Sequence, residues 1–375
     1  MVSVPASRPL RLLFNGLHSK SGGGLTYLKN ILPLIARDPN IDLHLCVHHD
    51  QRHLLPYDLE NVTVHYLNFL QGFWRLLVHE QIEVPILARR IGADVTFSPA
   101  NYGPLMAPNS VVLLRNALGV ASVERRPTKL SYWALVFVGT FLSLLVCRQA
   151  IAVSQYARDA VGGGPFGLFK GRLTVVPHGV SEIFSPPPPG TKRGDFLLAV
   201  SDIYVQKNLK NLIAAVARLR PDHRNISLKI VGEPVDAEYF AKLKQMVADE
   251  KLDGAVEFLG QVAPVDLADL YRRCRVFVFP STVETFGNPL VEVMACGAAI
   301  ASSNTAAMPE VVGNAAIFFN PTDIDEMAAA IDGLLADRYL RREVSRRAVQ
   351  RAKRFSWERT AEQTLAVIKR AATAQ

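Results

Sequence analysis

Residues 276–297 of the chain read VFVFPSTVETFGNPLVEVMACG, and this stretch decides the fold. An apolar run of strand type ends at Pro280, and a polar loop, STVETFG, follows it. The next residues predict a helix with Asn288 as its N-cap and Pro289 at its first position, where a missing N–H costs nothing. A buried strand, a polar loop and a helix in this order indicate a parallel α/β sheet, in which ligands bind at the carboxyl ends of strands.

Two carboxylates stand eight positions apart in this stretch. Glu284 lies in the predicted loop and Glu292 in the first helical turn, so both are expected at the end of the sheet. Free amides of Phe286 and Gly287 can meet a phosphate or sugar oxygen, and glycine has no side chain to block that approach. Because a carboxylate accepts hydrogen bonds from neighbouring hydroxyls, the pair suits two polyols such as a hexose and a ribose. The simpler alternative is a solvated Glu284 and a Glu292 that stabilises the helix N-terminus.

Outward from this block, short apolar runs alternate with amphipathic segments, which predicts parallel sheets with crossover helices. The first series of strands is expected at 10–17, 41–49, 62–67, 94–99, 110–116, 149–154 and 173–180. The second is expected at 195–201, 227–232, 255–260, 276–281, 298–303 and 315–320. The fold class is therefore α/β, with two Rossmann-like doubly wound domains and a ligand crevice at the carboxyl ends of their strands.

The segment FSPPPPGTKRG, 184–194, is the clearest domain boundary, because its four prolines flanked by glycine and basic residues predict a stiff, exposed connector. We expect an N-terminal domain over 1–183 and a C-terminal domain over 195–355. Residues 356–375 are expected to form a last amphipathic helix that packs back on the first domain. A chain of 375 residues suits two such domains.

The formal net charge is +8, and most of the basic excess falls in the first half of the sequence. Such an excess favours anionic lipid or phosphorylated substrates. No dense run of Lys and Arg with interleaved aromatics is present, so no nucleic-acid partner is expected. Four scattered cysteines without a C-x-x-C pair favour a reduced, cytoplasmic location. The N-terminal residues lack the pattern of a secretory signal.

One apolar segment, Leu130–Cys147, has eighteen residues without charge, at the lower edge of the length that spans a membrane. A true span is disfavoured, since a strand-like run begins almost at once, at Ala150. A helix buried in the first domain or at a subunit contact is the favoured interpretation. Shallow docking on the inner face of a membrane is the main alternative.

The block Glu284-TFGNPLV-Glu292, followed by MACG, resembles the E-x7-E signature of the family-4 retaining glycosyltransferases. The similarity continues in order along the chain, through SGGGLTYLKN, VVPHGV, AVSDIYVQKNLKNL, LKIVGEP and FSWERTAEQ. It implies the GT-B architecture, in which two Rossmann-like domains face a central cleft. It also implies transfer of a hexose from a nucleotide-diphosphate sugar to a saccharide or lipid-linked saccharide in polysaccharide or glycoconjugate synthesis. Mannosyl transfer is one such activity; the resemblance leaves the sugar and the nucleotide open.

The same resemblance implies roles for individual residues. Glu284 would contact hydroxyls of the donor sugar, Glu292 the ribose, and Lys207 the diphosphate, where a cation stabilises the departing charge. An ordinary exposed lysine at a helix start is the alternative for Lys207, and a flexible turn is the alternative for the glycine-rich loop. Further donor contacts are expected from Ser201, Gly232, Val262, Phe286, Gly287, Asn288, Gly22, Gly23 and Gly24.

Two places depart from the family pattern. After the fifth strand many relatives carry a His-Asp or His-Asn pair, whereas this chain has Arg115-Asn116. On the acceptor side, Asn116 is expected to hydrogen-bond a hydroxyl and Arg115 to attract an anionic group. Many relatives carry an arginine where this chain has Ser201-Asp202, so phosphate binding is expected to depend more on Lys207 and backbone amides.

The motif Asp323-Ile-Asp325 resembles the D-x-D that holds a metal in other glycosyltransferases. Acidic residues after Asn320-Pro321 are better explained as the start of a helix, so no metal and no cofactor are expected. Retention follows from the resemblance alone, and no carboxylate pair for double displacement is evident. The alternatives are a weakly active sugar-nucleotide-binding or scaffold protein of the same fold, and a GT-B-like sugar-nucleotide epimerase.

Overall fold

The computed structural model describes residues 8–55, 61–115, 124, 126–162 and 164–373. The chain forms two compact units. The first comprises the residues up to Leu118, Ser131–His178 and the residues from Trp357 onward, and the second comprises Gly119–Leu130 and Gly179–Ser356. The Pro-rich segment 184–194 lies within the second unit in this division.

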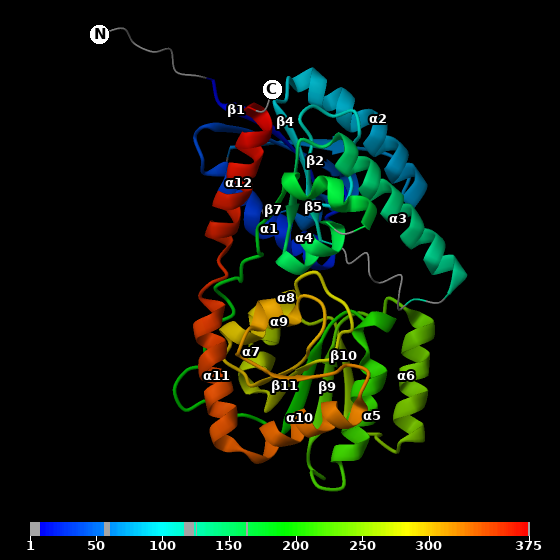
Figure 1. Ribbon diagram of the computed structural model, residues 1–375, viewed down its shortest axis with the longest axis vertical. Helices are drawn as coiled ribbons and strands as arrows, with labels where there is room; N and C mark the ends of the chain where they lie inside the picture. The colour runs from blue at the N-terminus through cyan, green and yellow to red at the C-terminus, as the bar shows by residue number, and fades with distance from the viewer. Residues whose placement is uncertain (1–7, 56–60, 116–123, 125, 163, 374–375) are drawn as a thin grey trace. The chain divides into compact units, whose positions relative to one another are not determined.

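The first unit contains a parallel sheet that has seven strands among the described residues, in the order β3-β2-β1-β4-β5-β6-β7 (Figure 1). The register aligns Leu12 of β1 with Leu43 of β2 on one side and with Val95 of β4 on the other. The strand predictions for this half are confirmed. The strands are β1 (Leu10–Asn15), β2 (Ile41–His48), β3 (Val62–Leu67), β4 (Val95–Ser98), β5 (Val111–Leu114), β6 (Gln149–Ala152) and β7 (Leu173–Val175).

The second unit contains a parallel sheet with six described strands, in the order β10-β9-β8-β11-β12-β13. Both sheets are doubly wound, because the chain leaves the central strand toward one edge and then returns to build the other side. The strand predictions are confirmed here as well. The strands are β8 (Phe196–Val200), β9 (Ser227–Val231), β10 (Val256–Gly260), β11 (Val276–Phe279), β12 (Ile300–Ser303) and β13 (Ile317–Phe319).

Helices connect the strands and cover the sheets. Those of the first unit, or shared by it, are α1 (Gly22–Ala36), α2 (Phe73–Ile91), α3 (Pro127–Val146), α4 (Gln155–Gly162) and α12 (Trp357–Thr373). Those of the second unit are α5 (Leu209–Leu219), α6 (Ala237–Asp249), α7 (Pro264–Arg273), α8 (Asn288–Ala295), α9 (Met308–Val312), α10 (Ile324–Ala336) and α11 (Arg338–Ala352). The 3-10 helices are His49–Leu54, Gly164–Arg172 and Val205–Lys207.

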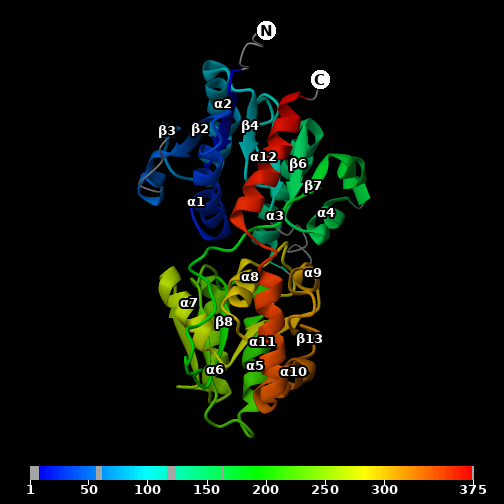
Figure 2. The same cartoon turned by 90° about the vertical axis from the view of Figure 1, so that its left-hand side faces the viewer.

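In the first unit, the last helix, α12, packs against α1 on one side of the sheet (Figures 1 and 2). The Tyr27 ring of α1 lies 5.8 Å from the ring of Trp357, and its hydroxyl lies 3.3 Å from Oγ1 of Thr364. Tyr27 is fully buried, so desolvation raises the pKa of its phenol. Residues more than three hundred positions apart thus complete one core.

In the second unit, α5 and α10 bury their apolar stripes against the sheet in one hydrophobic core. The Pro-rich connector is fastened to this unit by two arginines. Arg272 donates to the carbonyl oxygens of Ile183 and Ser185, each at 2.8 Å. Arg193 donates to the carbonyl oxygens of Cys274 and Gly297, at 3.1 and 2.6 Å. Proline stiffness and these hydrogen bonds fix the connector on the second unit.

Helix α3 carries the apolar segment that the sequence singled out, and it is long and apolar enough to cross a membrane by length and composition. Only 22% of the window Lys129–Val146 is buried. The expectation of a helix buried in the first domain is therefore wrong for most of this helix. The periodicity of the sequence did not predict this exposure, because apolar residues surround the helix on all sides. Those most exposed are Tyr132, Phe137, Val138, Leu142, Leu145 and Val146.

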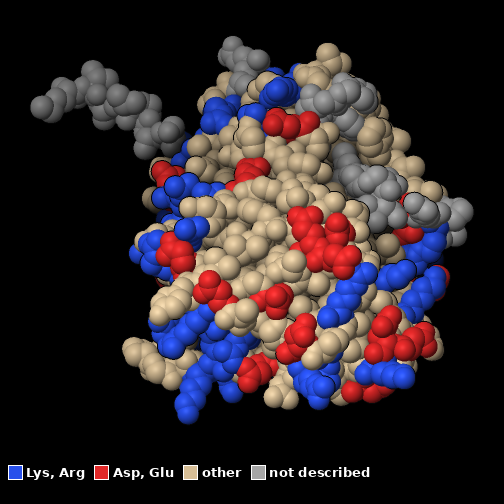
Figure 3. Space-filling model, turned by 60° about the horizontal axis from the view of Figure 1, so that its bottom comes forward, with Lys and Arg blue, Asp and Glu red and all other residues tan. Residues whose placement is uncertain are grey.

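Basic and acidic side chains alternate on the molecular face shown in Figure 3. Among the described residues on that face, basic side chains form no continuous track of the kind that follows a nucleic-acid backbone. The mixture matches the near balance of charge in the second half of the sequence.

Candidate functional site

The second sheet changes its winding direction between β8 and β11, which are hydrogen-bonded neighbours. In open parallel sheets the crevice outside the carboxyl ends of such strands is where ligands bind. The loop after β8 contains Lys207, in the 3-10 helix Val205–Lys207, and the loop after β11 contains Glu284. The topology therefore brings together two residues that are 77 positions apart in sequence.

Lys207 and Glu284 form an ion pair in which Nζ donates to Oε1 at 2.5 Å. Both side chains are partly open to solvent, with exposed fractions of 19% and 16%. The interpretation of Lys207 as an ordinary exposed lysine is wrong, because this residue is paired at the switch point. A cation that can face a diphosphate and a carboxylate that can accept from sugar hydroxyls thus stand side by side.

Hydrogen bonds hold the two loops in place. Thr282 N donates to the carbonyl oxygen of Gln206 at 2.9 Å, which joins the loop after β11 to the loop after β8. Asn208 has a left-handed conformation (φ 55°) and donates from Nδ2 to the carbonyl oxygens of Pro280 and Pro321, at 3.1 and 2.7 Å. The ion pair is therefore carried on loops that are fixed by hydrogen bonds to each other and to neighbouring turns.

Helix α8 begins next to this pair, and its start differs by one residue from the prediction. Gly287, with φ 86°, is the N-cap, and Asn288 is the first helical residue, so the prediction of Asn288 as N-cap is wrong. The left-handed conformation explains the difference, because glycine adopts it without steric cost. Phe286 is 3% exposed and packs edge-on against Phe355, with ring centroids 5.7 Å apart. Its backbone, rather than its ring, is the part suited to face a ligand.

Glu292 lies in the second turn of α8, not in the first turn as predicted, because the helix begins at Asn288. Oε2 of Glu292 accepts a hydrogen bond from the hydroxyl of Tyr271 at 3.0 Å. Burial raises the pKa of the Glu292 carboxyl to about 7, and the Tyr271 hydrogen bond opposes this shift. The position and burial of Glu292 are thus poorly explained by stabilisation of the first helical turn. A ligand hydroxyl would supply a hydrogen-bond donor for its carboxylate.

Gly232 and Ser201 lie together at the carboxyl ends of β9 and β8. A Cβ on Gly232 would lie 2.0 Å from the carbonyl oxygen of Ser201, and its φ is +143°. Only glycine fits this close approach. Asp202, which stands next to Ser201, accepts from the amide of Glu233 at 3.2 Å and so fixes the same turn. Val262, predicted near the nucleotide base, is half-buried between β10 and α7.

In the first unit, the three glycines form the first turn of α1 rather than a loop before it. The helix begins at Gly22 after the N-cap Ser21, so the prediction of a helix from Leu25 was three residues late. A Cβ on Gly24 would lie 1.8 Å from Nη1 of Arg115, which shows that the guanidinium rests directly on this glycine.

Arg115 follows β5, and hydrogen bonds fix both its backbone and its guanidinium. Its amide donates to Oδ1 of Asn101 at 2.9 Å, and Nη2 donates to the carbonyl oxygen of His18 at 3.0 Å. Burial lowers the pKa of the guanidinium to about 10. The predicted acceptor residue Asn116 lies outside the described residues.

Sequence reasoning missed a polar group in the first unit, formed by Asn15, His18, Glu80 and Ser98. Glu80 is completely buried and accepts from Nδ2 of Asn15 at 2.7 Å, and its other oxygen lies 3.0 Å from Nε2 of His18. One signal was present in the sequence: Glu80 shares the buried stripe of α2 with Val84 and Ala88, at helical spacing. A carboxylate in such a stripe needs polar partners.

The interpretation of Asp323 and Asp325 as a helix start is confirmed. Oδ1 of Asp323 accepts from the amide of Glu326 at 3.0 Å, which caps α10, and Asp325 pairs with Arg218. Among the residues that the structure describes, no three His, Cys, Asp or Glu side chains are grouped to hold a metal ion.

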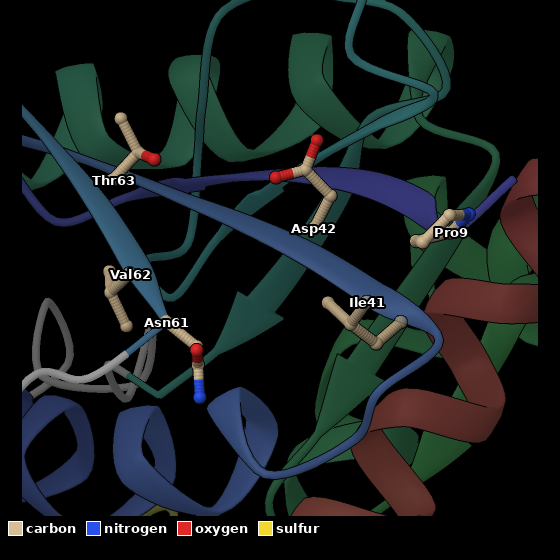
Figure 4. A pocket seen from close by; sticks show the side chains of 6 residues that line it. All are labelled: Pro9, Ile41, Asp42, Asn61, Val62 and Thr63. Carbon is tan, nitrogen blue, oxygen red and sulfur yellow. The ribbon is translucent and has the colours of Figure 1, made fainter.

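A shallow pocket lies where β1, β2 and β3 of the first sheet begin, at the amino ends of these strands (Figure 4). Its one charged lining residue, Asp42, accepts from Nε of Arg11 at 2.6 Å. The pocket is therefore remote from the carboxyl ends of the strands, where the candidate residues lie. Its lining is Pro9, Ile41, Asp42, Asn61, Val62 and Thr63.

The part of the chain that carries Lys207, Glu284 and Glu292, residues 182–354, matches the family model described as "Glycosyl transferases group 1". The second unit is a group 1 glycosyl transferase domain. The resemblance drawn from the E-x7-E block is thereby confirmed for the domain that contains it.

Curated relatives match about half of the chain. The O-antigen chain mannosyltransferase B of Escherichia coli is 33% identical over 170 residues, which cover 45% of this chain and 44% of that protein. The MMP alpha-(1->4)-mannosyltransferase of Mycolicibacterium hassiacum is 34% identical over 213 residues, which cover 55% of this chain and 50% of that protein. The chain thus spans about half the length of these relatives.

Solved structures extend the likeness to nearly the whole chain. The sucrose-phosphate synthase of Thermosynechococcus elongatus covers 98% of this chain, and 100% of that chain is covered, with a TM-score of 0.78 at 18% identity. The Anabaena protein HepE in complex with UDP-glucose covers 96%, with 99% of that chain covered, a TM-score of 0.75 and 19% identity. At these identities the likeness shows the fold. The predicted α/β fold with two Rossmann-like parallel-sheet domains of GT-B type is confirmed.

Proposed function

We propose that this protein transfers a hexose from a nucleotide-diphosphate sugar to a saccharide or lipid-linked saccharide, with retention and without a metal ion. The Lys207–Glu284 pair at the switch point of the second sheet is the observation that carries this proposal. It lies where a parallel sheet binds ligands, beside the start of α8 and inside the matched segment. Its two charges suit the two parts of such a donor, a diphosphate and a polyol.

In the proposed complex, the ammonium of Lys207 faces the diphosphate, Glu284 accepts from hydroxyls of the hexose, and Glu292 accepts from the ribose. Amides at the start of α8 add partial positive charge beside the phosphates. Lys207 then stabilises the charge that grows on the leaving diphosphate, in a site where it needs no reorganisation. Ser201, Gly232 and Val262 are proposed to contribute backbone contacts, and Gly22, Gly23 and Gly24 to face the donor from the first unit.

Retention is proposed to follow front-face substitution. The bond from C1 of the hexose to the phosphate oxygen breaks, and the bond from C1 to the acceptor oxygen forms on the same face. The acceptor's hydroxyl proton passes to the leaving phosphate oxygen, which removes the need for a second carboxylate. Glu284 is paired with Lys207, which disfavours its use as the nucleophile of a double displacement. An inverted anomeric centre in the product, seen by proton NMR, would refute this mechanism.

Mannose is the donor sugar that we propose to test first, because several of the relatives are named as mannosyltransferases. Thermal unfolding with GDP, UDP and dTDP identifies the nucleotide, since a ligand that binds only the folded state raises Tm by mass action. We expect one of the three to raise Tm, and to lose that effect in Lys207→Ala. No effect from any of them would contradict the proposed donor site.

A sugar-nucleotide-binding protein without turnover is the second candidate, favoured by Ser201-Asp202 in place of the family's arginine. Binding alone does not separate the two candidates. Release of nucleotide from a nucleotide sugar by the wild type, but not by Glu284→Ala, is the expected result for an enzyme. An epimerase would convert the sugar without releasing it to an acceptor.

We also propose that the first unit docks peripherally on an anionic membrane through α2 and α3. On α2, the side chains of Trp74, Val78, Ile82 and Ile86 form an i, i+4 stripe with exposed fractions of 49–67%. On α3, six large apolar side chains have exposed fractions of 41–50%: Tyr132, Phe137, Val138, Leu142, Leu145 and Val146. The two helices meet where the rings of Phe73 and Tyr132 lie 5.6 Å apart.

Charge complementarity favours lipid as the occupant of this surface. Arg75, Arg89 and Arg90 of α2 are exposed near the apolar stripe, and Arg148 follows α3. Basic residues around an apolar helical face attract anionic headgroups, at about 1 kcal/mol for each residue near the surface. We expect co-sedimentation with phosphatidylglycerol vesicles and much less with phosphatidylcholine vesicles.

Paired substitutions test this surface. Trp74→Ser with Phe137→Ser is expected to reduce vesicle binding at least tenfold, whereas Tyr339→Ser, at an exposed tyrosine of the second unit, leaves it unchanged. Self-association that the double substitution abolishes, without any vesicle binding, would show instead that a second copy covers this surface.

A further inference from the structure

The first sheet changes its winding direction between β1 and β4, and a polar network occupies that point. Asn15 ends β1 and Ser98 ends β4, and Nδ2 of Asn15 donates to Oγ of Ser98 at 3.1 Å. All of these groups are almost completely buried. The switch point of this sheet is therefore lined with hydrogen-bonding groups instead of the apolar side chains that fill the rest of its core.

Glu80 reaches this network from α2 and is 0% exposed. Both of its carboxylate oxygens are occupied, since one accepts from Nδ2 of Asn15 at 2.7 Å and the other faces Nε2 of His18 at 3.0 Å. Because a carboxylate only accepts, Nε2 of His18 must carry the hydrogen in this contact. In its neutral form, an imidazole with hydrogen on Nε2 presents a lone pair at Nδ1.

Nδ1 of His18 makes no hydrogen bond to any residue that the structure describes, and the side chain is 16% exposed. The ring is held on two further sides. Tyr102 packs edge-on against it with centroids 5.0 Å apart, and Arg115 donates to the His18 carbonyl oxygen at 3.0 Å. An oriented acceptor atom beside an aromatic ring is a common arrangement for binding a polyol, whose hydroxyls donate while its C–H face packs on the ring.

We propose that His18 is an acceptor-binding residue, which accepts at Nδ1 a hydrogen bond from a hydroxyl of the saccharide that receives the sugar. Glu80 and Asn15 are positioning residues, because they fix the tautomer and the orientation of the ring without touching the ligand. This inference rests on the proposed function for the identity of its ligand. It also places a histidine in the first unit of a chain that lacks the family's histidine after the fifth strand.

Acceptor kinetics test the role of His18. The donor is the nucleotide sugar that the wild type consumes, and the acceptor probes are mannose-, glucose- and N-acetylglucosamine-terminated saccharides. For His18→Ala we expect a loss of about 10–100-fold in kcat/KM for the acceptor, as for a removed hydroxyl partner. Slow hydrolysis of the donor by water and the affinity for nucleotide should not change.

The matched control is His79→Gln, which breaks another histidine–carboxylate pair of the same helix, between His79 and Glu83 at 2.5 Å. This substitution is expected to leave acceptor kinetics unchanged. Wild-type kcat/KM for the acceptor in His18→Ala, or an equal loss in His79→Gln, would overturn the proposal.

The positioning role of Glu80 has a spectroscopic test that does not need turnover. In protein labelled with 15N-histidine, the His18 ring, assigned by its loss in His18→Ala, is expected to show protonated Nε2 and unprotonated Nδ1. Glu80→Gln offers an amide donor to Nε2 and should shift the ring toward the Nδ1–H tautomer, with an increase in the KM for the acceptor. A wild-type ring with Nδ1 protonated at neutral pH contradicts the inference even if every donor proves inactive. If no donor is consumed but the His18 ring shows the expected Nε2–H tautomer, the result contradicts the proposed function and not the inferred orientation of His18.

Discussion

Nζ of Lys207 and Oε1 of Glu284 lie 2.5 Å apart, although the two residues belong to loops that follow different strands. The two charges are close enough to neutralise each other. In the complex proposed above, the diphosphate faces the ammonium and sugar hydroxyls face the carboxylate. The proposal therefore couples recognition of both parts of the donor through one ion pair.

Loss of the ammonium should weaken nucleotide binding more than it weakens the fold. The Lys207 side chain is 19% exposed, so a large stability contribution is not expected from its ion pair. Lys207→Ala should lower the affinity for the nucleoside diphosphate by about tenfold or more and kcat by about 10²–10³-fold. Isothermal titration and steady-state kinetics measure both, and Lys210→Ala, at an exposed lysine of α5, is the control. Equal losses in both variants would mean that net charge, rather than this site, determines binding.

Nucleotide binding should strengthen as pH rises through about 7, because burial raises the pKa of Glu292 to about that value. The ionised carboxylate accepts from ribose hydroxyls, whereas the protonated form has lost part of that capacity. Below this pKa the affinity is expected to fall by up to about tenfold per pH unit. Titrations at pH 6 and pH 8 test this, and Glu292→Gln should show little dependence on pH. The same slope in Glu292→Gln would exclude Glu292 as its source.

The raised pKa of Glu292 also predicts the direction in which the stability of the fold changes with pH. In the folded protein the pKa of about 7 lies above the ordinary value of 4.5 for this carboxyl, so folding favours the protonated form. The stabilising contribution is complete below pH 4.5 and is lost as pH rises to about 7. Relative to Glu292→Gln, the wild type should therefore lose Tm between pH 5 and pH 7 in the absence of nucleotide. A constant difference in Tm over that range would contradict the raised pKa.

Gly232→Ala should destabilise the second unit strongly. Its added Cβ would overlap the Ser201 carbonyl oxygen at 2.0 Å, and the φ of +143° is unfavourable for any other residue. Backbone strain of this kind costs about 1–3 kcal/mol, to which the steric overlap adds. Gly171→Ala, where a Cβ would meet no atom within 4 Å, is the control and should change Tm little. Similar Tm values for the two variants would mean that the turn relaxes freely.

The sequence predicted the sheets well because short β-branched runs bounded by turn residues rarely form anything other than strands. Each of the expected strands of both series is present in the described residues. The start of α8 was misplaced by one residue, since the pattern Asn-Pro fits an N-cap and the left-handed conformation of Gly287 is set by its tertiary contacts. Helix starts depend on such local details, whereas strands depend on composition.

The site was predictable only in part. Lys207 and Glu284 were identified from loop positions and the family resemblance, but their direct contact depends on which strands are neighbours. His18 and Glu80 were missed because their contact joins a loop to a helix 62 positions away. The exposure of α3 was also missed, because an apolar helix has the same sequence pattern in a core and on a surface.

The most direct test of the central claim is the release of nucleotide from GDP-mannose, UDP-glucose, UDP-N-acetylglucosamine and dTDP-rhamnose, measured by chromatography for the wild type and for Glu284→Gln. We expect the wild type to consume at least one donor and Glu284→Gln, with its charge removed and its shape kept, to do so at least about 10²-fold more slowly. Equal consumption by both proteins, or none by the wild type while it binds the nucleotide, would contradict a glycosyl-transfer site at Lys207 and Glu284.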